Sequence, residues 1–142
     1  MKISSRFSVA VHIGALLATE RTAVLTSEWM AASVNTNPVV IRRISAQLKK
    51  AGIIEGRSGT GGAKLAKDPD ELTLLDFYQA VQVVADNELF HIHSEPNPNC
   101  YVGANIQGVL EVMLGKAQRA MEEVLASMTL ADVLASFPEK IH

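Results

Sequence analysis

Three side chains in one short segment of the 142-residue chain have the chemistry to bind a metal or to react. They are His91, His93 and Cys100, within the sequence HIHSEPNPNC. Imidazole and thiolate together suit zinc or copper, although no fourth ligand is evident beside them. The thiol could instead sense oxidants or electrophiles, and a structural or merely exposed role is a third alternative. An enzyme that used Cys100 with His93 would lack a third, orienting group, so we do not expect catalysis.

The basic residues of the first half form a second group, with chemistry suited to a polyanion. Residues 1–67 carry ten Lys or Arg and three Asp or Glu, a net charge of +7. Residues 68–142 carry three Lys or Arg and twelve Asp or Glu, a net charge of −9. The whole-chain charge of −2 conceals this division. The asymmetry predicts an N-terminal part that faces nucleic acid and an acidic part that avoids it. The alternative is a solvated surface with scattered charges.

The elements that would position these basic residues lie in the stretch 26–54. Thr26 can cap a first short helix, because its side-chain oxygen can accept a backbone N–H at the helix start. Leu25, Trp29 and Ala32 recur at spacings of four and three, which places them on one apolar face.

A second helix is expected after a tight turn at residues 34–37. Asn37 can cap it, and Pro38 suits the first helical position because its missing N–H costs nothing there. The helix should run to Ala51 and stop at Gly52. Its inward stripe comprises Val40, Ile41, Ile44, Leu48 and Ala51. Other faces carry Arg42, Arg43, Gln47, Lys49 and Lys50. Two short helices joined by such a turn are typical of a helix-turn-helix.

A β-hairpin should follow the second helix directly. Residues 53–57 and 63–66 have the pattern of two short strands, and the glycine-rich residues 58–62 that of a turn. In DNA-binding proteins a hairpin at this position is called a wing. The glycines could also belong to a phosphate-binding loop, but neither a following helix nor the Lys-Ser/Thr pair of that motif is present.

The first helix should begin at Ser4 or Ser5 and run to about Ala18, supporting the helix-turn-helix. A secretory signal peptide is the alternative for this apolar stretch, but His12 interrupts it and no clear cleavage site follows. Further along the chain, Thr73 with Asp76 predicts a capping box that starts another helix. Thr129 repeats this capping chemistry for a short final helix.

A long helix is expected from Gly103 to about Met128. Its apolar residues recur in a heptad-like seam: Ile106, Leu110, Met113, Ala117, Ala120 and Val124. A second apolar row comprises Val109, Val112, Met121 and Leu125. We expect one side to pack on its own domain and the other on the same helix of a second subunit, so that the seam is a dimer interface. The alternative is burial within one monomer.

Composition fits one ordinary domain with an attached dimerising element. Apolar residues make up 48% and charged residues 20% of the chain, as is usual for globular proteins. The single cysteine excludes an internal disulfide and suits the cytoplasm. Nothing in the sequence approaches the apolar length of a membrane span. We therefore expect no membrane partner.

With these elements in order, the sequence resembles a family of bacterial winged helix-turn-helix regulators, the Rrf-two family of the IscR, NsrR and CymR type. The resemblance covers nearly the whole chain and rests on AGIIEGRSGTGGAKLAKDPDELTLLDFYQAV, residues 51–81, and on MTLADVL, residues 128–134. It implies a mainly α fold with a small β-hairpin: a winged helix-turn-helix plus a long C-terminal dimerisation helix. We expect a DNA-binding domain at 1–84, an irregular sensor or linker segment at 85–102, and a dimerisation and terminal helix at 103–142.

The resemblance also implies which residues contact DNA. The second helix would enter the major groove and meet base edges with its N-terminal residues, here Asn37, Val39, Val40, Arg42 and Arg43. Phosphate contacts are expected from Lys49, Lys50, Lys64 and Lys67. The family usually has an arginine directly before the wing glycines, for the minor groove. Here Ser58 holds that position and Arg57 lies one residue earlier, which would reverse its side-chain face.

The best-studied members of the family hold an iron–sulfur cluster on three cysteines, and this chain has only Cys100. One thiolate does not hold such a cluster, so no cofactor is expected. The sequence therefore predicts a sequence-specific transcription regulator, a repressor, that binds double-stranded DNA as a homodimer and responds to a redox, metal or small-molecule signal. The alternative is a protein-interaction module with a winged-helix fold that no longer binds DNA.

Overall fold

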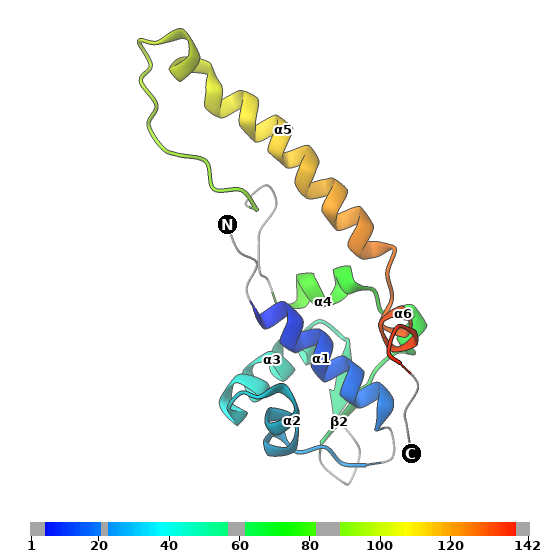
Figure 1. Cartoon of the computed structure of the whole chain (residues 1–142). Coiled ribbons are helices and arrows are strands. Elements are labelled where there is room, and N and C mark those ends of the chain that lie inside the picture. The colour runs from blue at the N-terminus through cyan, green and yellow to red at the C-terminus, as the bar shows by residue number, and fades with distance from the viewer. Residues whose placement is uncertain (1–4, 21–22, 57–61, 82–88, 139–142) are drawn as a thin grey trace.

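A computed structural model of the chain describes residues 5–20, 23–56, 62–81 and 89–138. Most helices gather in one body, and a single long helix, α5, projects from it (Figure 1). In chain order the elements are α1 (Ser5–Thr19), α2 (Ser27–Val34), α3 (Pro38–Lys50), β1 (Ile54–Gly56), β2 (Ala63–Leu65), the 3-10 helix η1 (Pro69–Glu71), α4 (Leu74–Ala80), α5 (Tyr101–Ala126) and α6 (Leu130–Ala135). The expected class, mainly α with a small hairpin and a long C-terminal helix, is confirmed.

The helix-turn-helix forms through the caps that the sequence predicted. Thr26 Oγ1 accepts the backbone N–H of Trp29 at 3.0 Å, and Asn37 Oδ1 accepts that of Val40 at 3.1 Å. Between the two helices, Asn35 has a left-handed backbone with φ 66°, which asparagine tolerates better than most residues. Its backbone N–H donates to the carbonyl of Ala31 and closes α2. Local chemistry therefore sets both ends of the turn.

The apolar face expected for α2 is wrong, because its two members within the helix are exposed and the two residues between them are buried. Trp29 is 48% exposed and Ala32 is also exposed, whereas Met30 and Ala31 are buried. An eight-residue helix has too few turns to define its face by periodicity, and packing against α3 decides the orientation. Leu25, the remaining member of the expected face, is buried directly before the helix.

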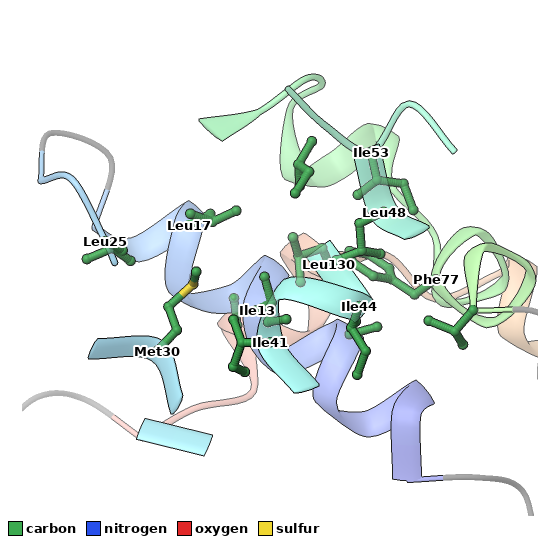
Figure 2. Close-up of a cluster of buried hydrophobic side chains, with 14 of the residues drawn as sticks. Ile13, Leu17, Leu25, Met30, Ile41, Ile44, Leu48, Ile53, Phe77 and Leu130 are labelled. Atoms are coloured by element: carbon green, nitrogen blue, oxygen red, sulfur yellow. The ribbon is translucent and has the colours of Figure 1, made fainter. Parts of the chain in front are cut away.

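An apolar core is shared by α1, α2 and α3 and by elements from later in the chain. Ile41, Ile44 and Leu48 are fully buried, as the stripe on α3 predicted, while Ala51 is exposed at the helix end. Figure 2 shows these side chains meeting Ile13 of α1 and Leu130 of α6. The core thus fixes the orientation of α3 from the side opposite its charged face.

The wing consists of two paired strands. β1 and β2 are antiparallel, with Glu55 opposite Lys64, and this confirms the expected hairpin. A strand follows the glycine-rich stretch, which rules out the strand–loop–helix order of a phosphate-binding loop. Arg57 and Ser58 lie outside the described residues, so their register stays a prediction.

The last helix joins the N-terminal body, although the sequence grouped it with the long helix in residues 103–142. Thr73 and Thr129 start α4 and α6 through capping boxes with Asp76 and Asp132, as their spacing predicted. α6 packs against α1 and η1 and contributes fully buried Leu130 to the core. The C-terminal end of α5 is therefore fastened to the body.

The long helix packs on the body over only part of its length. It begins at Tyr101 rather than Gly103 and contacts α4. Gly115 and Gln118 are its buried residues, and Gln118 Oε1 accepts the backbone N–H of Leu89 at 3.0 Å. The contact between α4 and α5 also affects Tyr78 of α4. Its pKa is raised mainly by burial and secondly by the negative charge of Glu122 on α5. Within the described residues, no helix is long and apolar enough to span a membrane.

Candidate nucleic-acid interface

The outward face of α3 is cationic and opposite its buried stripe. The exposed residues are Val39, Arg42, Arg43, Ala46, Lys49 and Lys50. The helix contains four cationic side chains and no acidic one. Because the core holds the other side, these charges face solvent in a fixed row. This row has the shape and charge that a major groove accepts.

The residues at the start of α3 differ in how freely they could reach a base edge. Val39 is exposed at the second helical position, where an apolar contact with a thymine methyl is available. Val40 is half-buried and packs against the core, which agrees with its place in the inward stripe and leaves it less surface for the predicted contact with a base. Asn37 is exposed, and its Oδ1 caps the helix, so its amide N–H groups are the donors available to DNA.

The two arginines of α3 have different surroundings. Arg42 Nη2 donates to Glu28 Oε1 of α2 at 2.7 Å, and the two side chains are 57% and 64% exposed. Arg43 is exposed, and no ion pair involves it among the described residues. Arg43 can therefore meet DNA without first leaving a carboxylate, whereas Arg42 is already oriented by one.

Of the four lysines predicted to contact phosphates, Lys49 and Lys50 line a groove between α3 and the wing. Lys49 and Lys50 are exposed at the end of α3, and Lys49 Nζ lies near Gly56, the last residue of β1. Lys64 Nζ lies 3.4 Å from Glu55 Oε1 across the hairpin, and Lys67 is exposed beyond it. The groove holds about 590 Å³, with Leu25, Met30, Ile54, Arg42, Lys49 and Lys50 among its lining residues. Two of the predicted phosphate contacts thus line this groove, whereas Lys64 lies on β2 and Lys67 two residues beyond it.

The residues predicted as a sensor are exposed and are not brought together as metal ligands. His91 and His93 precede α5 in an irregular segment, and Cys100 is the residue directly before the helix. Within the part of the chain that the structure describes, the only three potential ligands that converge are the exposed carboxylates of Asp68, Asp70 and Glu71. The arrangement gives no support to a site built from His91, His93 and Cys100. Their sensor role stays a prediction.

Cys100 has a local environment that favours its thiolate. The backbone N–H groups of Gly103 and then Val102, in the first turn of α5, lower the pKa of this exposed thiol. Gly103 is required here because a Cβ at this position would collide with the backbone carbonyl of Asn97. That carbonyl also accepts the N–H of Cys100 at 3.3 Å. The turn before α5 therefore holds the sulfur at the helix start.

The predicted dimer seam on α5 is largely uncovered. Met113 is 61% and Val124 57% exposed, and Ala117 and Ala120 are exposed between them. Ile106 and Leu110 are half-buried. From the second row, Val109 and Val112 are also exposed. The alternative of burial within one monomer does not fit this surface, because the residues in question face solvent in a single chain.

Comparison with known proteins identifies the family. The model of the Rrf2 family, described as iron-dependent transcriptional regulators, matches residues 3–136. The chain belongs to this family. It is also 48% identical over 132 residues to YwnA of Bacillus subtilis (strain 168), named as a candidate HTH-type transcriptional regulator, and the match covers 93% of the chain and 96% of YwnA. These matches confirm the resemblance read from residues 51–81 and 128–134.

Solved structures agree with the fold. A crystal structure described as a candidate DNA-binding protein is 45% identical, with a TM-score of 0.73, over 92% of this chain and 99% of that one. CymR (YrzC), described as the global cysteine regulator of B. subtilis, is 21% identical, with a TM-score of 0.71, over 97% and 99% of the two chains. The CymR likeness carries the fold alone. Membership in a family of transcriptional regulators favours gene regulation over the enzyme alternative considered for Cys100 and His93.

The description of the family mentions iron, which some proteins hold in iron–sulfur clusters. Iron–sulfur clusters are held by several thiolates, and Cys100 is the single cysteine. Among the described residues, His91 and His93 do not converge with Cys100 as a ligand group.

Two residues with clear roles at the interface and its support were not found from the sequence. Glu28 lies on a different helix from Arg42, and only the packing of α2 on α3 brings the two together. Gln118 stands among polar residues of α5, and only the structure shows that it is buried. The available signal for Glu28 was an acidic residue in the first turn of α2, since the basic half of the chain contains only three.

Proposed function

We propose that this Rrf2 protein is a sequence-specific transcription regulator, a repressor, that binds double-stranded DNA as a homodimer in the cytoplasm. One observation carries the proposal: the exposed face of α3 is a row of cations on a helix that its buried stripe holds rigidly. Basic residues supply affinity for phosphates, and a rigid helix end supplies base readout. The relatives named above support the same function.

In this proposal α3 enters the major groove with Val39 and Arg43 towards base edges. Lys49, Lys50, Lys64 and Lys67 contact the phosphates on either side. Lys64 must then exchange its partner Glu55 for a phosphate, which costs little because exposed ion pairs contribute only about 0–1 kcal/mol.

The dimer is part of the proposal because of the uncovered apolar row on α5. Exposed Met113, Val112 and Val124 form more apolar surface than an isolated helix usually leaves in water. A second copy of α5 would cover it, and a two-fold axis would place two copies of α3 on successive half-sites about one helical turn apart. A palindromic operator follows from this symmetry.

A double substitution tests DNA binding separately from assembly. With Arg42 and Arg43 both changed to Ala, we expect affinity for a duplex from the protein's own upstream region to fall at least about tenfold, because two cations leave the groove. Arg119→Ala, an exposed arginine on α5, is the matched control and should retain affinity. Sedimentation should show the same oligomer for all three proteins. Unchanged binding by the double variant would contradict α3 as the DNA-contacting helix, and a wild-type protein without measurable affinity for the duplex would favour the interaction-module alternative.

We further propose that the regulator works without an iron–sulfur cluster. A single cysteine supports this, since cluster ligation uses several thiolates. Protein purified without oxygen should contain no stoichiometric iron or acid-labile sulfide and should still bind its operator. Stoichiometric iron with sulfide would overturn the proposal.

A further inference from the structure

The ion pair between Glu28 and Arg42 connects the two helices of the helix-turn-helix on their exposed side. Glu28 is in the first turn of α2, which the Thr26 cap holds in place. Arg42 is on α3, in the cationic row. The 2.7 Å contact uses one N–H of the guanidinium, from Nη2, and one carboxylate oxygen.

Stability alone does not account for this pair. Both side chains are more than half exposed, and such pairs typically contribute about 0–1 kcal/mol. The carboxylate also stands beside a face that is otherwise cationic, since α3 has no acidic residue. For a protein that binds a polyanion, a negative charge at this position weakens attraction to every duplex. A compensating gain is therefore expected in another property.

That gain is orientation. An exposed arginine loses about 2 kcal/mol of rotamer entropy when it is fixed on binding, and fixing it beforehand reduces this cost. The guanidinium is planar, so holding it through Nη2 also sets the direction of its remaining N–H groups. Those groups match the O6 and N7 acceptors of guanine in the major groove.

We propose that Glu28 is a positioning residue that holds Arg42 for reading guanine and so increases the sequence specificity of the protein. The proposal rests on the proposed DNA-binding function and adds to it a residue on α2 that touches no base. It gives Glu28 two opposite effects: weaker binding to DNA in general, and stronger discrimination between sequences.

The two effects can be measured on four proteins: wild type, Glu28→Gln, Arg42→Ala and the double variant. Each is used to select duplexes from a random library. Each is then titrated against the wild-type selected duplex and a scrambled duplex at one salt concentration. For Glu28→Gln we expect tighter binding to the scrambled duplex and a specificity ratio about tenfold lower, the size of one base contact. Of the four proteins, only the wild type should select duplexes with guanine at one fixed position of each half-site.

A matched control separates orientation from charge. Glu55→Gln also removes one exposed acid that pairs with a cation, Lys64, but it does not touch Arg42. It should tighten binding to both duplexes equally and leave the specificity ratio unchanged. Thermal unfolding should be nearly the same for Glu28→Gln and wild type, because the pair is exposed.

The proposal is overturned if Glu28→Gln keeps the wild-type ratio and the guanine position. It is also overturned if Glu28→Gln lowers the specificity ratio by the same factor in the wild-type protein and in Arg42→Ala. Glu28 would then act independently of Arg42. A wild-type protein that selects no sequence would instead contradict the proposed function. The failures of the two proposals are thus distinguishable.

Discussion

The backbones of Thr73 and Thr129 pair in an isolated antiparallel bridge, although α4 and α5 separate them in the chain. The N–H of Leu74 donates to the carbonyl of Met128, and that of Leu130 to the carbonyl of Leu72, both at 2.8 Å. Each threonine also caps its own helix. This relationship ties the end of the long helix to the body that carries α3.

Removal of one of these caps should weaken the attachment. In Thr129→Ala the backbone N–H of Asp132 loses the hydroxyl that it meets at 3.0 Å. We expect the free energy of unfolding to fall by about 1 kcal/mol, a usual cost for a lost N-cap. Denaturant unfolding measures it. Thr129→Ser keeps the hydroxyl and should stay close to wild type; an equal loss in both variants would contradict a capping role.

A glycine in α1 provides a second stability prediction. A Cβ at Gly14 would lie 2.7 Å from Cζ of fully buried Phe77, which cannot move away without disturbing the core. Gly14→Ala should therefore lower the free energy of unfolding by about 1 kcal/mol, because the overpacking exceeds the gain in helix propensity. Gly108→Ala on α5 meets no atom within 4 Å and should gain about 0.5 kcal/mol. If Gly14→Ala stabilises as much as Gly108→Ala, the contact with Phe77 is not close.

The uncovered face of α5 predicts the effect of a charge in the seam. Met113→Lys would place an ammonium group between two copies of the helix, where a buried, unpaired charge is costly. We expect the dimer dissociation constant to rise at least about tenfold in sedimentation experiments. Glu111→Lys changes an exposed charge on the same helix outside the seam, so its dimer should persist. Equal dissociation of both variants would argue against this interface.

The lowered pKa of Cys100 predicts the pH dependence of its alkylation. Only the thiolate reacts, so a lower pKa in the folded protein shifts the midpoint of the rate profile to lower pH than in the unfolded chain. Iodoacetamide labelling followed by mass spectrometry measures this profile. The same protein in guanidinium chloride is the control, since unfolding removes the N–H groups of Val102 and Gly103 from the sulfur. Identical midpoints would contradict the influence of the helix start on the thiol.

Local chemistry made much of the fold predictable from the sequence. Thr26, Asn37, Thr73 and Thr129 start helices because each side chain serves its own neighbouring backbone, which a short stretch of sequence reveals. The stripe on α3 was also readable, because thirteen residues define a helical period. Where an element is short, as in α2, periodicity failed and Trp29 was assigned to the wrong face.

Contacts between distant segments were not predictable in the same way. The bridge from Thr73 to Thr129 and the pairing of Glu28 with Arg42 depend on how helices pack. Neither leaves a periodic signal in the chain. The cationic helix that carries the candidate DNA contacts could therefore be located from the sequence, while Glu28, the partner of Arg42, was found only in the structure.

The central claim is that the cationic face of α3 makes this protein a reader of DNA sequence. Its most direct test is a binding titration of the wild-type protein against a duplex from its own upstream region and a scrambled duplex, repeated at several salt concentrations. The account predicts a preference of about a thousandfold or more for the upstream duplex, with log affinity falling steeply as log salt rises. Equal affinity for both duplexes, or a salt slope near zero, would contradict it.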